Sequence, residues 1–261
     1  MNDQITPIIT DVLETMARSP ETKQFAVFDF DNTCIEHDIA EALLSYLCAN
    51  QLLKNNALLD IQFENKEVYH QKVLAHYYEL LEKGEIERAY RFTTQMLAGF
   101  HERDIKHLVS KTIVAEGTEI GTATLYDVTV AKGLRVRTDV IALLTALQTR
   151  HIKIWIVSAS PEVVVKAALS HYNIPGNCIG MRLQNLGHVF SDVVVEPLST
   201  LEGKVTCIQR YIHPAQQPIL GIGDSMNDFP MLDYSHIKVV VNRHNKLAEE
   251  AAQNNWHLIT A

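Results

Sequence analysis

Short apolar runs alternate with helix-length segments at both ends of the chain. Runs that predict strands buried on both faces stand at 25–28, 152–157, 178–181, 219–222 and 237–241, of which 178–181 is the weakest. Residues 138–150 carry apolar side chains at helical spacing and precede one of these runs. Strands separated by helices indicate βαβ units, so we predict an α/β fold with a central parallel sheet flanked by helices.

The pattern changes between about residues 36 and 132. Apolar residues recur there at helical spacing, and Lys83-Gly84 and Ala98-Gly99 are typical of helix ends. We therefore predict a helical segment inserted directly after the first strand. This divides the chain into a core of residues 1–35 and 133–261 and a helical cap domain of residues 36–132.

Composition and charge narrow the class of partner. The chain has 261 residues, of which 47% are hydrophobic and 21% charged, as in an ordinary soluble globular protein. A formal net charge of −8 argues against nucleic acid as the main partner, because nucleic-acid binding usually requires a basic face. None of these patterns indicates an oligomeric state.

Several sequence features favour a cytoplasmic setting. No apolar run reaches the length of a transmembrane segment, and residues 1–19 lack the basic-then-apolar layout of a signal peptide. The four cysteines lie far apart without a C-x-x-C pair, so neither a zinc site nor a disulfide framework is indicated. We therefore expect no membrane association and a reduced, cytoplasmic environment.

Polar clusters follow the predicted strands or open a helix between them. They are Asp29-Phe30-Asp31-Asn32-Thr33, Ser158-Ala159-Ser160-Pro161, Glu202-Gly203-Lys204 and Gly223-Asp224-Ser225-Met226-Asn227-Asp228. Ligands bind at the carboxyl ends of strands in an open parallel sheet, so we expect Asp29, Asp31 and Asp224 to converge there. Unpaired carboxylates would repel one another, which implies a cation. Oxygen-only ligands favour Mg²⁺ over zinc.

Each cluster taken alone has an ordinary structural explanation. A serine after an apolar strand is usually a helix N-cap, a lone lysine usually faces solvent, and Gly-Asp-Ser is a common turn. The joint occurrence of all four clusters at one edge of one sheet favours a functional site.

The four clusters together resemble the four-part signature of the haloacid dehalogenase (HAD) superfamily. The matching residues are Asp29-x-Asp31-x-Thr33, Ser158, Lys204 and Gly223-Asp224-x-x-x-Asp228. The position of the inserted segment resembles the C1-capped members of that superfamily. Asp31-Asn32-Thr33 and Glu202-Gly203-Lys204 further resemble its phosphoserine phosphatase-like branch. The resemblance implies a Rossmann-like core and a Mg²⁺-dependent phosphatase.

The resemblance also implies a role for each residue of the signature. Asp29 would attack phosphorus and form an aspartyl-phosphate, while Asp31 would act as acid and then as base. Mg²⁺ would be bound by Asp29, Asp224 and the backbone carbonyl of Asp31. Groups expected to bind the phosphoryl oxygens are Ser158, the backbone N–H of Ala159, Lys204 and Asn227. Outside this set, Asp228 would orient Lys204 or a metal-bound water, and Thr33 would stabilise the first loop.

Other functions within the same resemblance are less compatible with these residues. Dehalogenases lack the second aspartate that Asp31 supplies, phosphomutases usually carry glycine where Asn32 stands, and transport ATPases need membrane helices. The alternative from a different class is a non-catalytic phosphate-binding or scaffold protein. Such a protein predicts the loss of an acid–base or metal-binding residue, and each of these residues is present.

A cap that closes over the site should admit a small organic phosphate and exclude folded proteins. Asp38 stands where phosphoserine phosphatases bind the substrate ammonium, but it is equally well placed to cap a helix that begins at Ile39. The arginine that binds the substrate carboxylate in those enzymes falls near Thr93 here, with Arg88 and Arg91 displaced, which argues against phosphoserine. An enzyme that acts on phosphocholine or phosphoethanolamine would need a site for the substrate cation but no arginine for a substrate carboxylate.

Aromatic residues that could surround such a cation are Tyr46, Tyr69, Tyr77, Tyr78, Tyr90 and Phe92. At helical spacing they are also typical of the packed core of a helical domain.

Overall fold

The computed structural model describes residues 3–18, 23–60 and 65–260. Its helices are α1 (Ile5–Arg18), α2 (Ile39–Ala49), α3 (Lys66–Glu82), α4 (Ile86–Gln95), α5 (Glu102–Glu116), α6 (Thr138–Gln148), α7 (Glu162–Tyr172), α8 (Glu202–Tyr211), α9 (Phe229–Asp233) and α10 (Lys246–Gln253). Its strands are β1 (Phe25–Phe28), β2 (Ile35–Glu36), β3 (Gly121–Leu125), β4 (Val128–Lys132), β5 (Arg135–Val136), β6 (Lys153–Pro161), β7 (Asn177–Leu186), β8 (Val189–Val195), β9 (Leu220–Gly223), β10 (Ile237–Asn242) and β11 (His257–Thr260). Residues 1, 2 and 19 of the N-terminal segment considered above lie outside the described residues.

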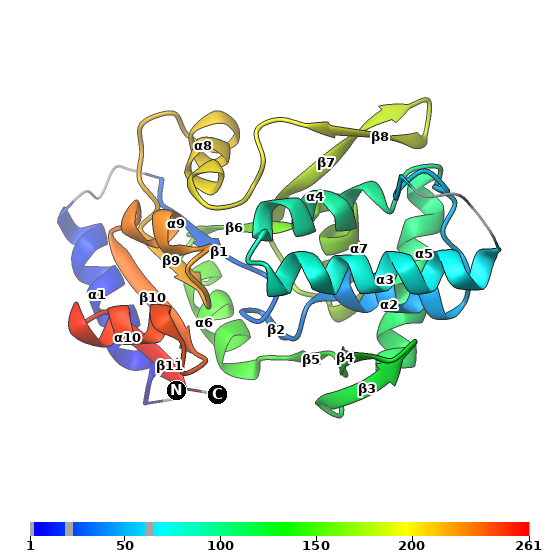
Figure 1. The fold of residues 1–261 in the computed structure, drawn as a ribbon. Helices are drawn as coiled ribbons and strands as arrows, with labels where there is room; N and C mark the ends of the chain where they lie inside the picture. The colour runs from blue at the N-terminus through cyan, green and yellow to red at the C-terminus, as the bar shows by residue number, and fades with distance from the viewer. Residues whose placement is uncertain (1–2, 19–22, 61–64, 261) are drawn as a thin grey trace.

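Within the described residues, one seven-stranded sheet has the order β11-β10-β9-β1-β6-β7-β8 (Figure 1). Every neighbouring pair from β11 to β7 is parallel, and β8 is antiparallel to β7. The predicted α/β fold with a central parallel sheet is confirmed, and β8 is an antiparallel addition at its edge. All five predicted strand runs lie in this sheet, with boundaries within a few residues.

Strand β1 lies at the centre because its side chains are apolar on both faces. Ala26 and Phe28 pack into the larger hydrophobic core with residues of α1 and α6. Phe25 and Val27 point to the opposite face and contact Ile208 of α8. A four-residue strand without a polar side chain needs cover on both sides, and neighbouring helices provide it. The loop that follows β1 is therefore placed at the middle of the sheet edge.

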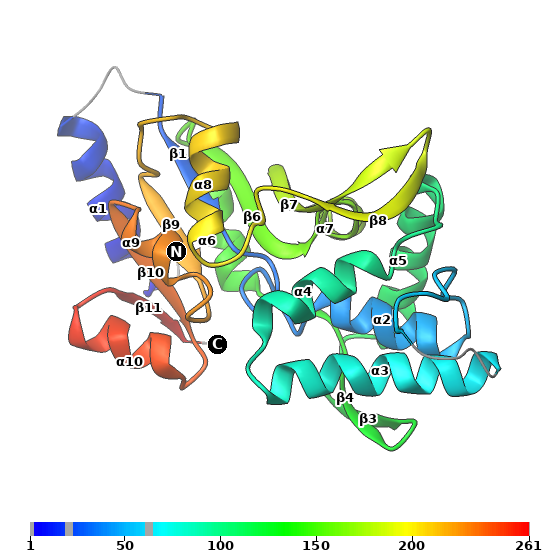
Figure 2. The ribbon, with the colours of Figure 1, turned by 45° about the horizontal axis from the view of Figure 1, so that its top comes forward.

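The sequence predicts a helical inserted segment, but part of this segment is not helical. Helices α2, α3, α4 and α5 pack together beside the sheet (Figure 2), but residues 121–132 form the antiparallel hairpin β3–β4. The two strands pair along their whole length, and Val130 of β4 is their one buried side chain. The chain enters and leaves the segment through β2 and β5, which pair with each other.

A second hairpin connects the sheet to the inserted helices. Strands β7 and β8 pack beside α4, and the start of β8 bridges to His101 just before α5 (Figure 2). The amide of Gly99 donates to the carbonyl of Phe190 in β8 at 2.9 Å, and the amide of Phe190 donates to the carbonyl of Phe100 at 3.0 Å. These backbone bonds attach the loop between α4 and α5 to the sheet.

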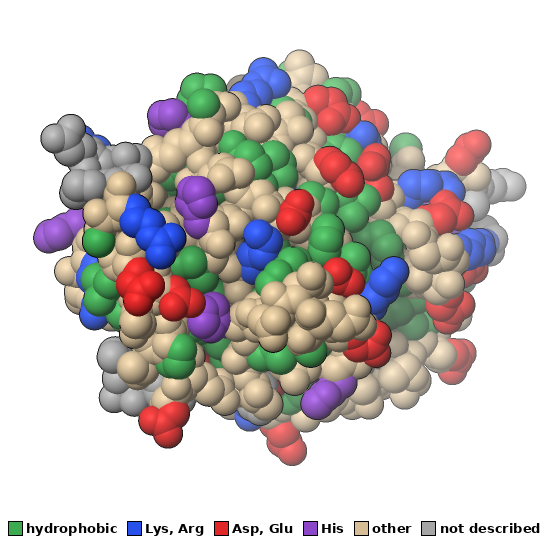
Figure 3. All heavy atoms as spheres, turned by 90° about the vertical axis from the view of Figure 1, so that its left-hand side faces the viewer, with side chains coloured by type: hydrophobic (Ala, Val, Ile, Leu, Met, Phe, Trp, Pro, Cys, Tyr) green, Lys and Arg blue, Asp and Glu red, His purple; other side chains and the backbone are tan. Residues whose placement is uncertain are grey.

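The molecular face over α1 and α10 carries basic, acidic and hydrophobic side chains that are interspersed (Figure 3). Among the described residues, no helix is both long enough and apolar enough to cross a membrane.

Helix α8 starts in a crowded turn. The amide of Gly203 donates to the carbonyl of Thr200 at 2.9 Å. A Cβ atom at Gly203 would lie 2.0 Å from the carbonyl oxygen of Leu198, which is far inside van der Waals contact. Only glycine fits at this position without a shift of the backbone.

We expect Gly203→Ala to lower the free energy of unfolding by about 1–3 kcal/mol, as overpacking against backbone usually does. Urea denaturation measures this change. Gly121→Ala is the matched control, because its Cβ would meet open space. Equal stability of the two variants would contradict the packing described for the start of α8.

Candidate active site

The loop after β1 has a tightly constrained backbone. The amide of Asp29 donates to the carbonyl of Ile222 in β9 at 2.9 Å, and the amide of Cys34 donates to the carbonyl of Phe30 at 2.8 Å. Asn32 has a φ of +57°, a left-handed conformation that asparagine tolerates better than most residues. Local sequence and sheet register together place the loop at the carboxyl end of β1.

Lys204 of α8 lies between two carboxylates. Its ammonium nitrogen is 2.7 Å from Oδ1 of Asp29 and also forms an ion pair with Oδ1 of Asp228. The lysine side chain is fully buried. Burial opposes its protonation, but the charges of Asp228 and Asp29 outweigh this effect and raise the pKa of Lys204. The site therefore contains a fixed positive charge beside the expected nucleophile.

Asp228 also fixes the loop that follows β9. Its Oδ2 atom accepts hydrogen bonds from the amides of Asp224 and Ser225, at 3.0 and 3.2 Å. The other oxygen contacts Lys204. A single buried carboxylate thus joins the lysine of α8 to the loop that carries Asp224.

Two further predicted residues join neighbouring loops. The side-chain oxygen of Asn227 accepts hydrogen bonds from Oγ1 of Thr200 at 2.6 Å and from the amide of Leu201 at 2.9 Å. The hydroxyl of Thr33 donates to Oδ1 of Asp224 at 3.4 Å. Asn227 lines the same pocket as the aspartates, so it can both support the loop before α8 and reach a ligand.

The carboxylate of Asp31 has its own set of hydrogen-bond donors. The hydroxyls of Ser160 and Ser158 donate to its Oδ2 atom at 2.7 and 3.2 Å, and the amide of Ile39 donates to its Oδ1 atom at 2.8 Å. Ser160 is not among the residues predicted from the sequence. Its position two residues after Ser158, in the same polar run, is the signal that would have indicated it.

The carboxylates that converge are those of Asp29, Asp224 and Asp228. One oxygen from each lies within 4.8 Å of the others, and all three residues are buried. The predicted residues Asp29, Asp31 and Asp224 do line one pocket. The cluster of closely spaced oxygens nevertheless contains Asp228 and not Asp31, whose side chain is engaged by the two serines. The donors are all carboxylate oxygens in a buried position, so the residues fit a hard divalent cation such as Mg²⁺.

Burial and the charges of neighbouring carboxylates raise the pKa values of the pocket aspartates. Burial and the neighbouring Asp228 raise the pKa of Asp29 to about 8, despite the opposing effect of Lys204. Burial and Asp228 also raise the pKa of Asp224 to about 6. For Asp31, burial together with the charges of Asp38 and Asp29 holds the pKa well above its usual range. A bound cation would relieve this repulsion.

The aspartates line a small pocket of about 110 Å³, whose wall includes residues of the inserted segment. Tyr90 of α4 and Asp38 at the start of α2 both line it. Oδ1 of Asp38 accepts hydrogen bonds from the amides of Ala40 and Glu41, at 2.7 and 3.0 Å. The N-cap interpretation of Asp38 is therefore confirmed, and the same residue also faces the pocket.

The loop after β10 supplies two contacts that the sequence interpretation did not include. Nη1 of Arg243 donates to Oδ2 of Asp224 at 2.7 Å, and the side-chain amide of Asn245 donates to the backbone carbonyl of Asp224 at 2.8 Å. The strand at 237–241 was predicted correctly. Its carboxyl end lies at the same sheet edge, so the polar residues after it were the available signal.

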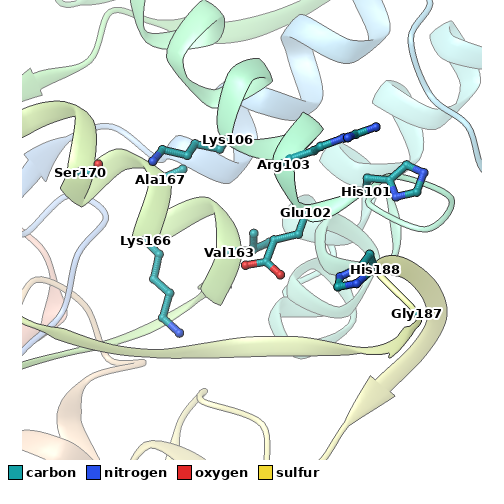
Figure 4. A pocket seen from close by; sticks show the side chains of 10 residues that line it. All are labelled: His101, Glu102, Arg103, Lys106, Val163, Lys166, Ala167, Ser170, Gly187 and His188. Carbon is teal, nitrogen blue, oxygen red and sulfur yellow. The ribbon is translucent and has the colours of Figure 1, made fainter.

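A larger cavity of about 660 Å³ lies elsewhere, between α5, α7 and the turn of the β7–β8 hairpin. Its charged side chains include Lys106 and Arg103 of α5 and Lys166 of α7, and they point in different directions (Figure 4). Lys166 is paired with Glu162. The smaller pocket is the better candidate because its charged groups converge at the carboxyl ends of strands.

Comparison with known proteins identifies the family. The model of the haloacid dehalogenase-like hydrolases matches residues 26–233. The chain therefore belongs to the haloacid dehalogenase-like hydrolase family.

Individual relatives narrow the class further. The chain is 28% identical to phosphorylcholine phosphatase of Pseudomonas aeruginosa over 77% of its own length and 68% of that protein. Its fold is similar to that of a protein of unknown function from Anaerococcus prevotii, with a TM-score of 0.73, 21% identity and coverage of 98% and 91% of the two chains. For a substrate-bound phosphoserine phosphatase the TM-score is 0.54, with 12% identity and coverage of 88% and 90%. The predicted assignment to the phosphatases of this superfamily is confirmed at the level of class.

The raised pKa values generate a prediction for the metal-free protein. The folded-state pKa values of Asp224 and Asp38, about 6, and of Asp29, about 8, exceed the ordinary value of 3.8. A raised carboxyl pKa stabilises the fold below the ordinary value, and this stability is lost as pH rises through the folded-state value. In EDTA, the free energy of unfolding should fall from about pH 4 to about pH 9.

Urea denaturation across this range measures the effect, with saturating Mg²⁺ expected to reduce it. In Asp29→Asn the fall between about pH 7 and pH 9 should be smaller than in the wild type. A stability in EDTA that rises with pH over this window would contradict the charge arrangement described.

Proposed function

We propose that this hydrolase is a Mg²⁺-dependent phosphomonoesterase that acts through an aspartyl-phosphate on Asp29. The observation that carries the proposal is the separation of two carboxylates on one loop. Asp29 faces Lys204 and the converging acids, whereas Asp31 is held by serine hydroxyls and a backbone amide. The first arrangement suits a nucleophile, and the second suits an acid–base group.

The proposed reaction assigns one step to each carboxylate. Asp29 forms a bond to phosphorus as the bond to the alcohol oxygen breaks, and Asp31 gives its proton to the departing alkoxide. Burial and the charges of Asp38 and Asp29 raise the pKa of Asp31, which favours the protonated carboxyl that this step needs. Asp31 then accepts a proton from the water that attacks phosphorus, which releases phosphate and restores Asp29.

The remaining pocket residues would bind the phosphoryl group. Lys204 supplies a positive charge, and Ser158, Ala159 and Asn227 line the pocket beside it. A Mg²⁺ ion would be held by Asp29 and Asp224, with the backbone carbonyl of Asp31 as a further expected ligand. When bound, it would neutralise charge between the nucleophile and the phosphate.

The inserted segment supports a small substrate. We propose that residues 36–132 form a cap over a core of residues 1–35 and 133–261, because Asp38 and Tyr90 bring its helices to the pocket wall. A pocket enclosed in this way suits a small organic phosphate. The intact acid–base pair and the phosphatase relative both favour an enzyme over the alternative of a non-catalytic phosphate-binding or scaffold protein.

We further propose that the substrate carries an amine, as phosphocholine and phosphoethanolamine do. Asp38 lines the pocket, and burial together with the charge of the neighbouring Glu41 raises the pKa of Asp38. Both residues are partly buried. Glu41 accepts a hydrogen bond from the hydroxyl of Tyr78 at 2.6 Å. Among the described residues, no lysine or arginine forms an ion pair with either carboxylate. A substrate cation next to Tyr90 would supply the missing charge.

Phosphoserine is less compatible with this pocket because its carboxylate would need a basic partner. The two cap arginines considered for this role are engaged at the surface. Arg88 is paired with Glu85, and Arg91 with Glu87. The name of the relative from Pseudomonas aeruginosa, a phosphorylcholine phosphatase, agrees with a substrate that has a cation and no carboxylate.

The test of the mechanism compares the two aspartates of the first loop, with Mg²⁺ present and removed. Hydrolysis of an aryl phosphate should require Mg²⁺ and stop in EDTA. Asp29→Asn should abolish turnover and covalent phosphorylation, because an amide does not attack phosphorus at a useful rate. Asp31→Asn should slow turnover by about 10²–10⁴ and slow an alkyl phosphate more than an aryl phosphate, whose leaving group needs no proton. Identical profiles for the two variants would refute the division of roles.

The substrate proposal is tested at Asp38 with two substitutions. Asp38→Asn keeps a capping oxygen but removes the charge, whereas Asp38→Ala removes both. In each variant the ratio of kcat/KM for phosphoethanolamine to that for glycerol phosphate should fall by about tenfold or more. Only Asp38→Ala should lower the Tm markedly. An unchanged ratio in Asp38→Asn would show that Asp38 acts only as a helix cap.

A further inference from the structure

Arg243 engages one of the proposed metal-binding carboxylates directly. Its Nη1 atom is 2.7 Å from Oδ2 of Asp224, and the other carboxylate oxygen accepts from Thr33 at 3.4 Å. Asp224 is buried, whereas the side chain of Arg243 is 40% exposed. Both oxygens of this carboxylate therefore have partners, and one partner carries a full positive charge.

The backbone beside Arg243 is held in place. The side chain of Asn245 donates to the carbonyl of Asp224 at 2.8 Å, and its oxygen accepts from the amide of Ala248 at 3.2 Å, which caps α10. The amide of His244 donates to the side chain of Asn242 at 2.9 Å. These hydrogen bonds fix the backbone from which the side chain of Arg243 extends to Asp224, while the guanidinium itself retains access to solvent.

Among the described residues, Lys204 and Arg243 form ion pairs with the three converging carboxylates, and these two cations differ in burial. Lys204 is fully buried between Asp29 and Asp228, so moving it would leave both acids without a partner. Arg243 is the exchangeable cation, because its half-exposed guanidinium can turn toward water at little cost in solvation. A divalent ion that approaches Asp224 must therefore compete with Arg243 and not with Lys204.

We propose that Arg243 occupies Asp224 in the metal-free enzyme and is displaced when a divalent cation binds, so that this arginine sets the affinity of the site for Mg²⁺. The inference rests on the metal site of the proposed function. The arginine keeps Asp224 paired while the metal is absent, and it weakens metal binding by the work needed to separate the ion pair. Arg243 is thus a positioning residue that acts through Asp224.

The experiment measures the Kd for Mg²⁺ by calorimetric titration of metal-free protein, without substrate. Arg243→Gln should bind Mg²⁺ about tenfold more tightly than the wild type, because one competing charge is gone. Its Tm in EDTA should be lower, and its rise in Tm on saturation with Mg²⁺ larger. Arg243→Lys keeps the charge and should stay within about threefold of the wild-type Kd. Arg103→Gln is a control, since that exposed arginine of α5 pairs with Asp104.

The outcomes separate the inference from the proposed function. An equal or higher Kd in Arg243→Gln overturns the competition, and an unchanged Kd with a raised KM assigns Arg243 to substrate binding instead. If Arg243→Gln does not fold, NMR of the wild type provides the test. The Nε–Hε signal of Arg243 is assigned by its loss in Arg243→Lys. This signal must shift when the wild type is saturated with Mg²⁺. An unmoved signal refutes displacement. If neither the wild type nor Arg243→Gln binds Mg²⁺, the metal site of the proposed function fails as well.

Discussion

Repulsion between buried carboxylates is the constraint on which this structure depends. Asp29, Asp224 and Asp228 lie within one small pocket, where burial makes each charge costly. Lys204 offsets part of this cost from inside the core, and Arg243 offsets part of it from the solvent side. The remaining imbalance is the physical basis for expecting a divalent cation, and it links the stability of the metal-free protein to its function.

The fold serves this cluster by bringing short loops to one edge of the sheet. Strands β1, β6 and β9 are adjacent, so the polar residues after them meet although they lie far apart in the chain. Lys204 reaches the same point from the first turn of α8, where Gly203 allows close approach to Leu198. The inserted segment completes the wall of the pocket with Asp38 and Tyr90. The proposed substrate-selecting residue, Asp38, therefore comes from the inserted segment, and the proposed nucleophile, Asp29, comes from the core.

Several features could be predicted from local patterns because their causes are local. The apolar run of β1 indicates a doubly covered strand, and the polar residues after it indicate a ligand site. Helix α1 and strand β11 were not predicted, and the hairpin β3–β4 was mistaken for part of a helical segment. The strands in residues 121–132 mix exposed and half-buried positions with one buried side chain, Val130. Their pairing therefore depends on a partner strand and not on a strong periodic signal.

The sequence by itself determined the fold class, the order of the strands along the chain and the residue types that meet at the sheet edge, since periodicity and residue chemistry are readable without coordinates. Only the tertiary structure decided which oxygens converge. Asp31 lines the same pocket as Asp29 and Asp224, as predicted. Its carboxylate accepts a hydrogen bond from Ser160, however, and Asp228 is the third residue of the closely spaced group. Side chains two residues apart on a loop can point to different partners, and that choice depends on hydrogen bonds from strands and helices distant in sequence.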